Sequence, residues 1–167
     1  GNAEPSAIVC DESAKAMMER LAATAGISRL LTLNADGLSG SLISESRDLP
    51  AEFEVVMREE DDLAALLYSS GTTGVPKGIM LSHSNLLENA LSLIECWGFS
   101  DKDVLLHALP IFHVHGLFVA PGCVFLSGAS MRWLPAFNAK QVMACLPACS
   151  VMMGVPTYYT RLLAEPG

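Results

Sequence analysis

Short apolar segments that alternate with helix-like segments constrain the fold of the second half of this chain. Three of them are nearly all apolar, as strands buried on both faces should be: DVLLHALP, SMRWL and SVMMGVP, at 103–110, 130–134 and 150–156. Between the first two lies FHVHGLFVAPGCVFLSGA, which we expect to be a helix disturbed at Pro121. Between the last two lies NAKQVMACLPA, where Asn138 and Gln141 are spaced as a capping-box variant. Because such an alternation requires right-handed crossovers, it predicts an α/β fold with a doubly wound, mostly parallel sheet and flanking helices.

The N-terminal part, residues 1–38, is predicted to be a strand-helix-strand unit. SAIVC and RLLTL are strand-like, and Gly26 supplies a helix stop between them. Asp11 or Ser13 can cap that helix. Its apolar residues recur at the spacing of a one-sided helix: Ala14, Met17, Met18, Leu21, Ala22 and Ala25. Residues 39–62 are polar and acidic and are expected to form a connector, followed by a third part at 63–167.

The composition limits where the protein can act and what it can bind. With 167 residues, of which 51% are hydrophobic, the chain can bury a sizeable core. No segment approaches the roughly 20 apolar residues of a membrane span, and the N-terminus does not read as a secretory signal. We therefore expect a cytoplasmic protein, or one of an organelle matrix if a targeting segment has been removed. A net charge of −8 argues against nucleic acid as a partner, because nucleic-acid affinity depends on neutralising phosphates.

The stretch YSSGTTGVPKG, residues 68–78, has the composition of a phosphate-binding loop. It is not a Walker A loop, because Pro76 stands where that motif requires glycine and Gly78 where it requires Ser or Thr. The apolar segment that follows is strand-like, so the loop is expected to join two strands. Two glycines can let backbone N–H groups converge on an anion, four hydroxyl groups can donate, and Lys77 adds a cation. Read by itself, the same stretch is better explained as a hairpin turn with a surface lysine.

The complete string YSSGTTGVPKG, followed by LSHSNL, closely resembles the phosphate-binding signature of the adenylate-forming superfamily, which includes acyl-CoA synthetases. The resemblance implies that the loop wraps the β and γ phosphates of ATP while a substrate carboxylate attacks the α phosphate. A CoA thiolate then displaces AMP from the acyl adenylate, and Mg²⁺ neutralises phosphate charge. The implied cofactors and co-substrates are ATP, Mg²⁺ and CoA. The implied phosphate-binding residues are Ser69, Ser70, Gly71, Thr72, Thr73, Gly74 and Lys77.

Two further stretches, HALPIFHVHGLFV (107–119) and GVPTYYTRLL (154–163), are most similar to the malonyl-CoA synthetases. The resemblance covers about residues 61–163 and implies an acid–CoA ligase acting on malonate or methylmalonate. The second carboxylate of such a substrate must be paired once it leaves water, and His113 and Arg161 are the candidate partners. Alternatively, His113 is a buried or helix-capping histidine and Arg161 lies on the solvated face of a terminal helix.

Members of this superfamily run several hundred residues, so we expect this chain to be one compact fragment of a larger N-terminal domain. The fragment is predicted to be catalytically incomplete, with no catalytic residue of its own. Apolar surface exposed by truncation would favour self-association. Two alternatives remain: an acyl-CoA synthetase for a fatty or aryl acid, and a non-catalytic α/β binding module.

Two other kinds of site fit the sequence poorly. A zinc site would have to draw on His107, His113, His115 and Cys123, but no tight cysteine pair accompanies them. A serine hydrolase would need a GxSxG motif, which does not occur. The cysteines, odd in number and without framework spacing, are expected to be reduced core residues.

Overall fold

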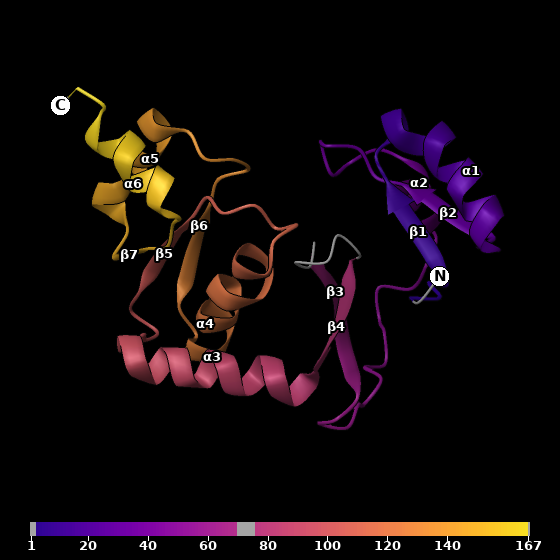
Figure 1. Cartoon of the computed structure of the whole chain (residues 1–167), viewed down its shortest axis with the longest axis horizontal. Helices are drawn as coiled ribbons and strands as arrows, with labels where there is room; N and C mark the ends of the chain where they lie inside the picture. The colour runs from indigo at the N-terminus through magenta and orange to yellow at the C-terminus, as the bar shows by residue number, and fades with distance from the viewer. Residues whose placement is uncertain (1–2, 70–75, 167) are drawn as a thin grey trace. The chain divides into compact units, whose positions relative to one another are not determined.

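The computed structural model describes residues 3–69 and 76–166. The chain divides into two compact units, residues 1–57 and 58–167 (Figure 1). Within the described residues, none of the helices is long and apolar enough to cross a membrane.

The first unit is built on two parallel strands joined by a helix. Strand β1 (Ala7–Cys10) pairs with β2 (Arg29–Thr32), and a 3₁₀ turn (Glu12–Ala14) and α1 (Lys15–Ala25) connect them. The Asp11 carboxylate accepts a hydrogen bond from the N–H of Ser13 at 2.8 Å and opens the 3₁₀ turn. Gly26, at φ 71°, ends α1 in the left-handed conformation that glycine adopts without strain.

A short helix that the sequence did not predict, α2 (Ser41–Ser46), lies in the stretch interpreted as a connector. It is held to the end of β2 by reciprocal bonds of 2.9 Å. The N–H of Thr32 donates to Ser41 Oγ, and the N–H of Ser41 donates to Thr32 Oγ1. Gly40 makes this close approach feasible, because a Cβ there would lie 2.3 Å from the Thr32 carbonyl oxygen. The limits given to the connector, 39–62, stay a prediction.

The second unit opens with an antiparallel hairpin that carries the glycine-rich loop. Strand β3 (Leu63–Ser69) pairs with β4 (Lys77–Ser82), so the loop joins two strands as predicted. Helix α3 (His83–Trp97) follows directly. It starts with a capping box, in which Ser82 Oγ accepts from the N–H of Asn85 at 3.1 Å and Asn85 Oδ1 accepts from the N–H of Ser82 at 3.2 Å. It ends at Gly98, whose φ is 66°.

A three-stranded parallel sheet forms the centre of the second unit, with strand order β6-β5-β7. The strands are β5 (Val104–His107), β6 (Ser130–Trp133) and β7 (Val151–Met152). Helix α4 (Ala120–Ser127) connects β5 to β6. Helix α5 (Ala139–Cys145) and a 3₁₀ turn (Leu146–Ala148) connect β6 to β7, and α6 (Pro156–Leu163) follows.

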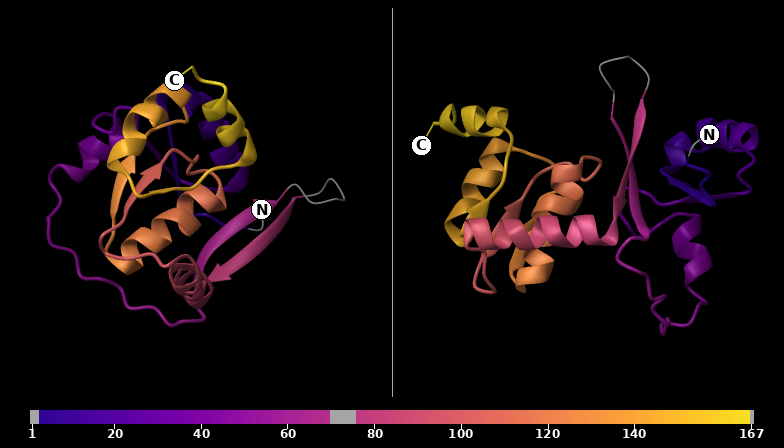
Figure 2. Two further views of the ribbon diagram at one scale, coloured as in Figure 1. Left: turned by 90° about the vertical axis from the view of Figure 1, so that its left-hand side faces the viewer. Right: turned by 60° about the horizontal axis from the view of Figure 1, so that its bottom comes forward.

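Both faces of this sheet are covered, which confirms the predicted doubly wound α/β fold (Figure 2). On one face Leu105 packs in a cluster with residues of α3 and α4, including Cys123. On the other face Leu106 packs with Val142 of α5 and Leu162 of α6. Because β5 leads to β6 on one side and the chain then crosses to β7 on the other, the carboxyl end of β5 lies at a topological switch point.

The helical segment between β5 and β6 is disturbed, but not at Pro121 as the sequence suggested. Residues His115–Val119 form a π-helix, and α4 begins after it with Pro121 in its first turn. Proline cannot donate the N–H that a continuous helix would need at this place. The irregularity falls on the residues just before the proline, where the N–H of Ala120 donates to the carbonyl of His115 in the wider π turn.

Removing the capping box should destabilise the second unit measurably. We expect Ser82→Ala to lower its free energy of unfolding by about 1 kcal/mol, because the N–H of Asn85 loses its acceptor. Urea unfolding followed by tryptophan fluorescence checks this, since both tryptophans, Trp97 and Trp133, belong to this unit. The matched control, Ser92→Ala on the exposed middle of α3, should cause no loss.

The start of the sheet should be sensitive to acid through Asp103. Its carboxylate accepts from the N–H of Ser100 at 2.8 Å and from the hydroxyls of Ser100 at 2.9 Å and Ser150 at 2.8 Å. The bond from Ser150, followed by those from Ser100, holds the pKa of Asp103 below its ordinary value. This stabilisation is complete above the unfolded pKa of about 3.9 and is lost as the pH falls through the lower folded value.

The measurement is the urea midpoint of the second unit between pH 6 and pH 3. Asp103→Asn should have a smaller pH dependence than the wild type in this range. Asp101→Asn, which changes an exposed carboxylate in the same turn, should keep the wild-type slope. An unchanged slope in Asp103→Asn would mean that the Ser100 and Ser150 bonds do not favour the ionised form.

Candidate functional site

The glycine-rich loop starts and ends on two facing residues. Ser69, the last residue of β3, is the Cα partner of Lys77, the first residue of β4. Both side chains are exposed. The remaining predicted loop residues, Ser70, Gly71, Thr72, Thr73 and Gly74, lie outside the described residues. The hairpin therefore presents a hydroxyl and an ammonium group side by side at the base of the loop.

A hollow of about 450 Å³ lies between this hairpin and the segment that follows β5. Leu67, Ser69 and Ile79 line it from the hairpin, and Phe112 and His113 line it from the other side. Phe112 is 88% exposed, so its ring is available to anything that enters. The structure thus brings Ser69 and His113, two residues predicted from separate motifs, to one hollow.

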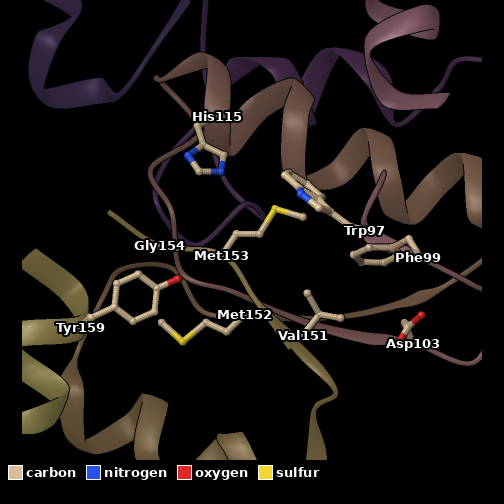
Figure 3. A pocket seen from close by; sticks show the side chains of 10 residues that line it. Trp97, Phe99, Asp103, His115, Val151, Met152, Met153, Gly154 and Tyr159 are labelled. Carbon is tan, nitrogen blue, oxygen red and sulfur yellow. The ribbon is translucent and has the colours of Figure 1, made fainter. Parts of the chain in front are cut away.

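The segment 109–116 is the shared wall of three hollows. His113 lines the hairpin hollow and also a smaller one of about 150 Å³, whose lining includes His115 and Tyr158. His115 in turn lines a third hollow of about 420 Å³, shown in Figure 3. There its ring lies near Met153, and Tyr159 approaches from α6. His113 therefore stands between the hairpin-side hollow and the small one, and His115 stands between the small one and the third.

The tight turn before the π-helix places these histidines. The N–H of His113 donates to the carbonyl of Pro110 at 3.2 Å. Gly116 is buried against the same carbonyl, and a Cβ there would lie 2.3 Å from its oxygen. Only glycine fits this approach without a shift of the backbone. The two contacts with the Pro110 carbonyl therefore fix the position of residues 113–116 relative to the end of β5.

The electrostatics favour a neutral His115. Burial lowers the pKa of His115 below its ordinary value, and the neighbouring charge of His113 lowers it further. At neutral pH the His115 ring is therefore a hydrogen-bond donor and acceptor rather than a cation. His113 itself is exposed.

Arg161 lies apart from the other candidates. It is exposed in the last turn of α6, in a separate hollow of about 350 Å³ that Asn138 and Glu165 also line. This hollow shares no lining residue with those of His113. The structure brings His113 and Ser69 together but does not bring Arg161 to them.

Three features of this region were not predicted from the sequence. It treated HVH as part of a helix, whereas His113 precedes the helical turns and His115 opens a π-helix. It gave no role to Phe112 or to Gly116. One sequence pattern could have indicated the irregular turn: a glycine, Gly116, directly after His115 at the start of an apolar helix that contains a proline. A glycine in such a place often allows one stretch of backbone to pack closely against another. Across residues 3–69 and 76–166, no group of three or more His, Cys, Asp or Glu side chains is arranged to hold a metal ion.

Known proteins resemble this chain along nearly its whole length. The profile of the family described as AMP-binding enzyme matches residues 1–167. The mitochondrial malonate–CoA ligase ACSF3 of Xenopus laevis is 33% identical over 94% of this chain, and that of Homo sapiens is 32% identical over 93%. The chain spans only 28% and 29% of the length of these two relatives.

A solved structure is also similar to this chain in sequence and in fold. ATP-bound MatB from Rhodopseudomonas palustris is 46% identical, with a TM-score of 0.92 over 98% of this chain and 32% of that one. The match of the family profile to every residue, together with this likeness, identifies the chain as a member of the AMP-binding enzyme family.

Proposed function

We propose that this chain is part of an ATP-dependent acid–CoA ligase that forms an acyl adenylate and then an acyl-CoA thioester. The observation that carries the proposal is the 46% identity to an ATP-bound protein over 98% of the chain, including the hairpin that holds the phosphate-loop string. Because the chain spans about a third or less of its relatives, it would supply the phosphate loop and part of the acid site, while other residues complete the enzyme.

In this proposal the hairpin positions the triphosphate of ATP. Ser69 and Lys77 would contact phosphate oxygens from the two ends of the loop, because they are paired across the hairpin and exposed. Ser70, Gly71, Thr72, Thr73 and Gly74 would complete the cradle with hydroxyl and backbone N–H donors. The two ends of the loop offer a hydroxyl donor and a positive charge to the phosphate anion. Mg²⁺ bound with ATP would neutralise more of the phosphate charge.

The acid would be malonate or methylmalonate. The support is the similarity to proteins named malonate–CoA ligase and the position of His113 in the hollow next to Ser69. His113 is exposed in this hollow, and an imidazole N–H can donate a hydrogen bond to the second carboxylate. His115, kept neutral, would contribute a hydrogen bond. Arg161 remains a second proposed partner, with weaker support because it lines a separate hollow.

The remaining partners follow from the reaction. CoA is the proposed acceptor of the acyl group, and self-association through exposed apolar side chains is a further proposal. The mitochondrial relatives support an organelle matrix as the place of action, and a cytoplasmic location stays a prediction.

Replacing the loop lysine should weaken binding of nucleotide or pyrophosphate. We expect Lys77→Ala to raise the Kd for pyrophosphate or MgATP roughly 10-fold, because a charge-assisted hydrogen bond to phosphate is lost. Isothermal titration of the 167-residue chain checks this. Lys140→Ala, an exposed lysine on α5, is the control and should bind like the wild type. Equal affinity in the Lys77 and Lys140 variants would leave the loop as an ordinary hairpin turn.

The acid is tested by ATP–pyrophosphate exchange in a longer protein that contains this sequence. Malonate or methylmalonate should support exchange, and His113→Ala should raise the KM for malonate about 10-fold with a smaller effect on the KM for ATP. Arg161→Ala tests the second proposed partner in the same assay. Exchange with acetate or a fatty acid but not with malonate would overturn the substrate, and no exchange with any acid would favour a non-catalytic binding module.

A further inference from the structure

The small hollow beside the two histidines has a tyrosine, Tyr158, in its lining, and the sequence suggested no role for this residue. The hollow has a volume of about 150 Å³. His113, His115 and Tyr158 supply its polar side chains, and the other residues that line it, such as Leu109, are apolar. An apolar cavity of about 150 Å³ in another protein holds a single benzene molecule. The hollow is therefore large enough for one small organic group and too small for a long chain.

Several contacts hold the ring of Tyr158 in place. Its hydroxyl donates a hydrogen bond to the carbonyl of Ala108 at 3.2 Å. Its ring stacks on Phe137, with ring centroids 3.8 Å apart and an interplanar angle of 18°. The ring lies close to the backbone of Gly154, because a Cβ there would be 3.2 Å from Tyr158 Cδ2. It also packs against the buried cluster that contains Leu105. This wall cannot move aside without loss of a hydrogen bond and a stacking contact.

Two other parts of the lining are also held firmly. Leu109 is 4% exposed and belongs to the same buried cluster against which Tyr158 packs. Gly116 lies so close to the Pro110 carbonyl that the backbone cannot shift towards it. His113 is different, because it is exposed and also lines the hollow beside Ser69. A small acid can thus reach the small hollow from the hairpin side, past His113.

We propose that Tyr158 is a specificity-determining residue, whose fixed ring limits the acid to a short dicarboxylate. This inference rests on the proposed function, because it takes the acid to bind beside His113. One carboxylate lies in the hairpin hollow, and the rest of the acid lies in the small hollow. There the imidazoles of His113 and His115 can donate hydrogen bonds to the second carboxylate. A substituent much larger than a methyl group meets the ring of Tyr158.

The rigidity of the wall is what makes the size limit sharp. A side chain that is free to turn makes room for a larger ligand, whereas overfilling a well-packed site forces side chains off their rotamers and is costly. Tyr158 has little freedom, because its hydroxyl is bonded to Ala108 and its ring is stacked on Phe137. Removing the ring opens the space between the small hollow and Phe137, so larger acids gain room there.

The test is ATP–pyrophosphate exchange in a longer protein that contains this sequence. The acids are malonate and malonates that carry a methyl, ethyl or butyl group on the central carbon, so both carboxylates are kept and only the bulk changes. The wild type should lose about tenfold or more in kcat/KM between methylmalonate and butylmalonate. Tyr158→Ala should raise the ratio of kcat/KM for butylmalonate to kcat/KM for malonate by about tenfold or more.

Three further variants separate size from other effects of this residue. Tyr158→Phe loses the bond to Ala108 but keeps the stacked ring, so it should keep the wild-type ratio. Tyr159→Ala removes the neighbouring tyrosine, which lines the third hollow and not this one, and should keep that ratio as well. Tyr158→Leu retains an apolar side chain and replaces Tyr158→Ala if that variant does not fold. It should raise the ratio in the same direction.

The outcomes distinguish this inference from the function on which it rests. Equal exchange of the wild type with butylmalonate and malonate would disprove the size limit without any variant. An unchanged ratio in folded Tyr158→Ala or Tyr158→Leu would remove the role of Tyr158 and leave the proposed function intact. If the wild type exchanged with no acid at all, the proposed function would be wrong, and this inference with it.

Discussion

The second unit depends on the burial of strand β5 from both faces. Leu105 and Leu106 are each 0% exposed, and they point to opposite sides of the sheet. Each buried leucine of this kind contributes on the order of 2 kcal/mol of hydrophobic free energy. One face requires α3 and α4 and the other requires α5 and α6, so a single four-residue strand organises both helical layers. The crossovers that supply these layers place the carboxyl end of β5 at the switch point, and the HVHG segment leaves from there.

Much of this fold could be predicted from the sequence because its signals are local. The apolar run around β5 is recognisable from consecutive residues alone. So are the ends of α1 and α3, which fall at glycines in the left-handed conformation, Gly26 at φ 71° and Gly98 at φ 66°. The strand-like segments on either side of the glycine loop are likewise local signals, and they pair as the hairpin of β3 and β4. By contrast, α2 depends on bonds between Thr32 and Ser41 that form only once β2 is in place.

The candidate site was less predictable, since it depends on which surfaces meet. Motif reading found Ser69, Lys77 and His113, but nothing local says that Ser69 and His113 line one hollow while Arg161 lines another. The π-helix lies just before Pro121, which cannot donate to a continuous helix, and a Cβ at Gly116 within it would lie 2.3 Å from the Pro110 carbonyl oxygen, a contact between residues that a local motif does not reveal. The burial of His107 without a hydrogen-bonding partner among the described residues results from tertiary packing. The sequence shows only that a histidine lies in an apolar strand.

The two ends of β5 carry titratable side chains that respond to acid in different ranges of pH, Asp103 before its start and His107 at its end. At its start, Asp103 must be ionised to accept from Ser100 and Ser150, and a carboxylate with a lowered pKa keeps its charge in moderately acidic solution. At its end, His107 must be neutral, and an imidazole gains its proton in a higher range of pH. Mild acidification therefore acts on His107, at the carboxyl end of β5, before it acts on Asp103, at the amino end. The end of β5 from which the chain runs on to the hairpin hollow is thus the more pH-sensitive of its two ends.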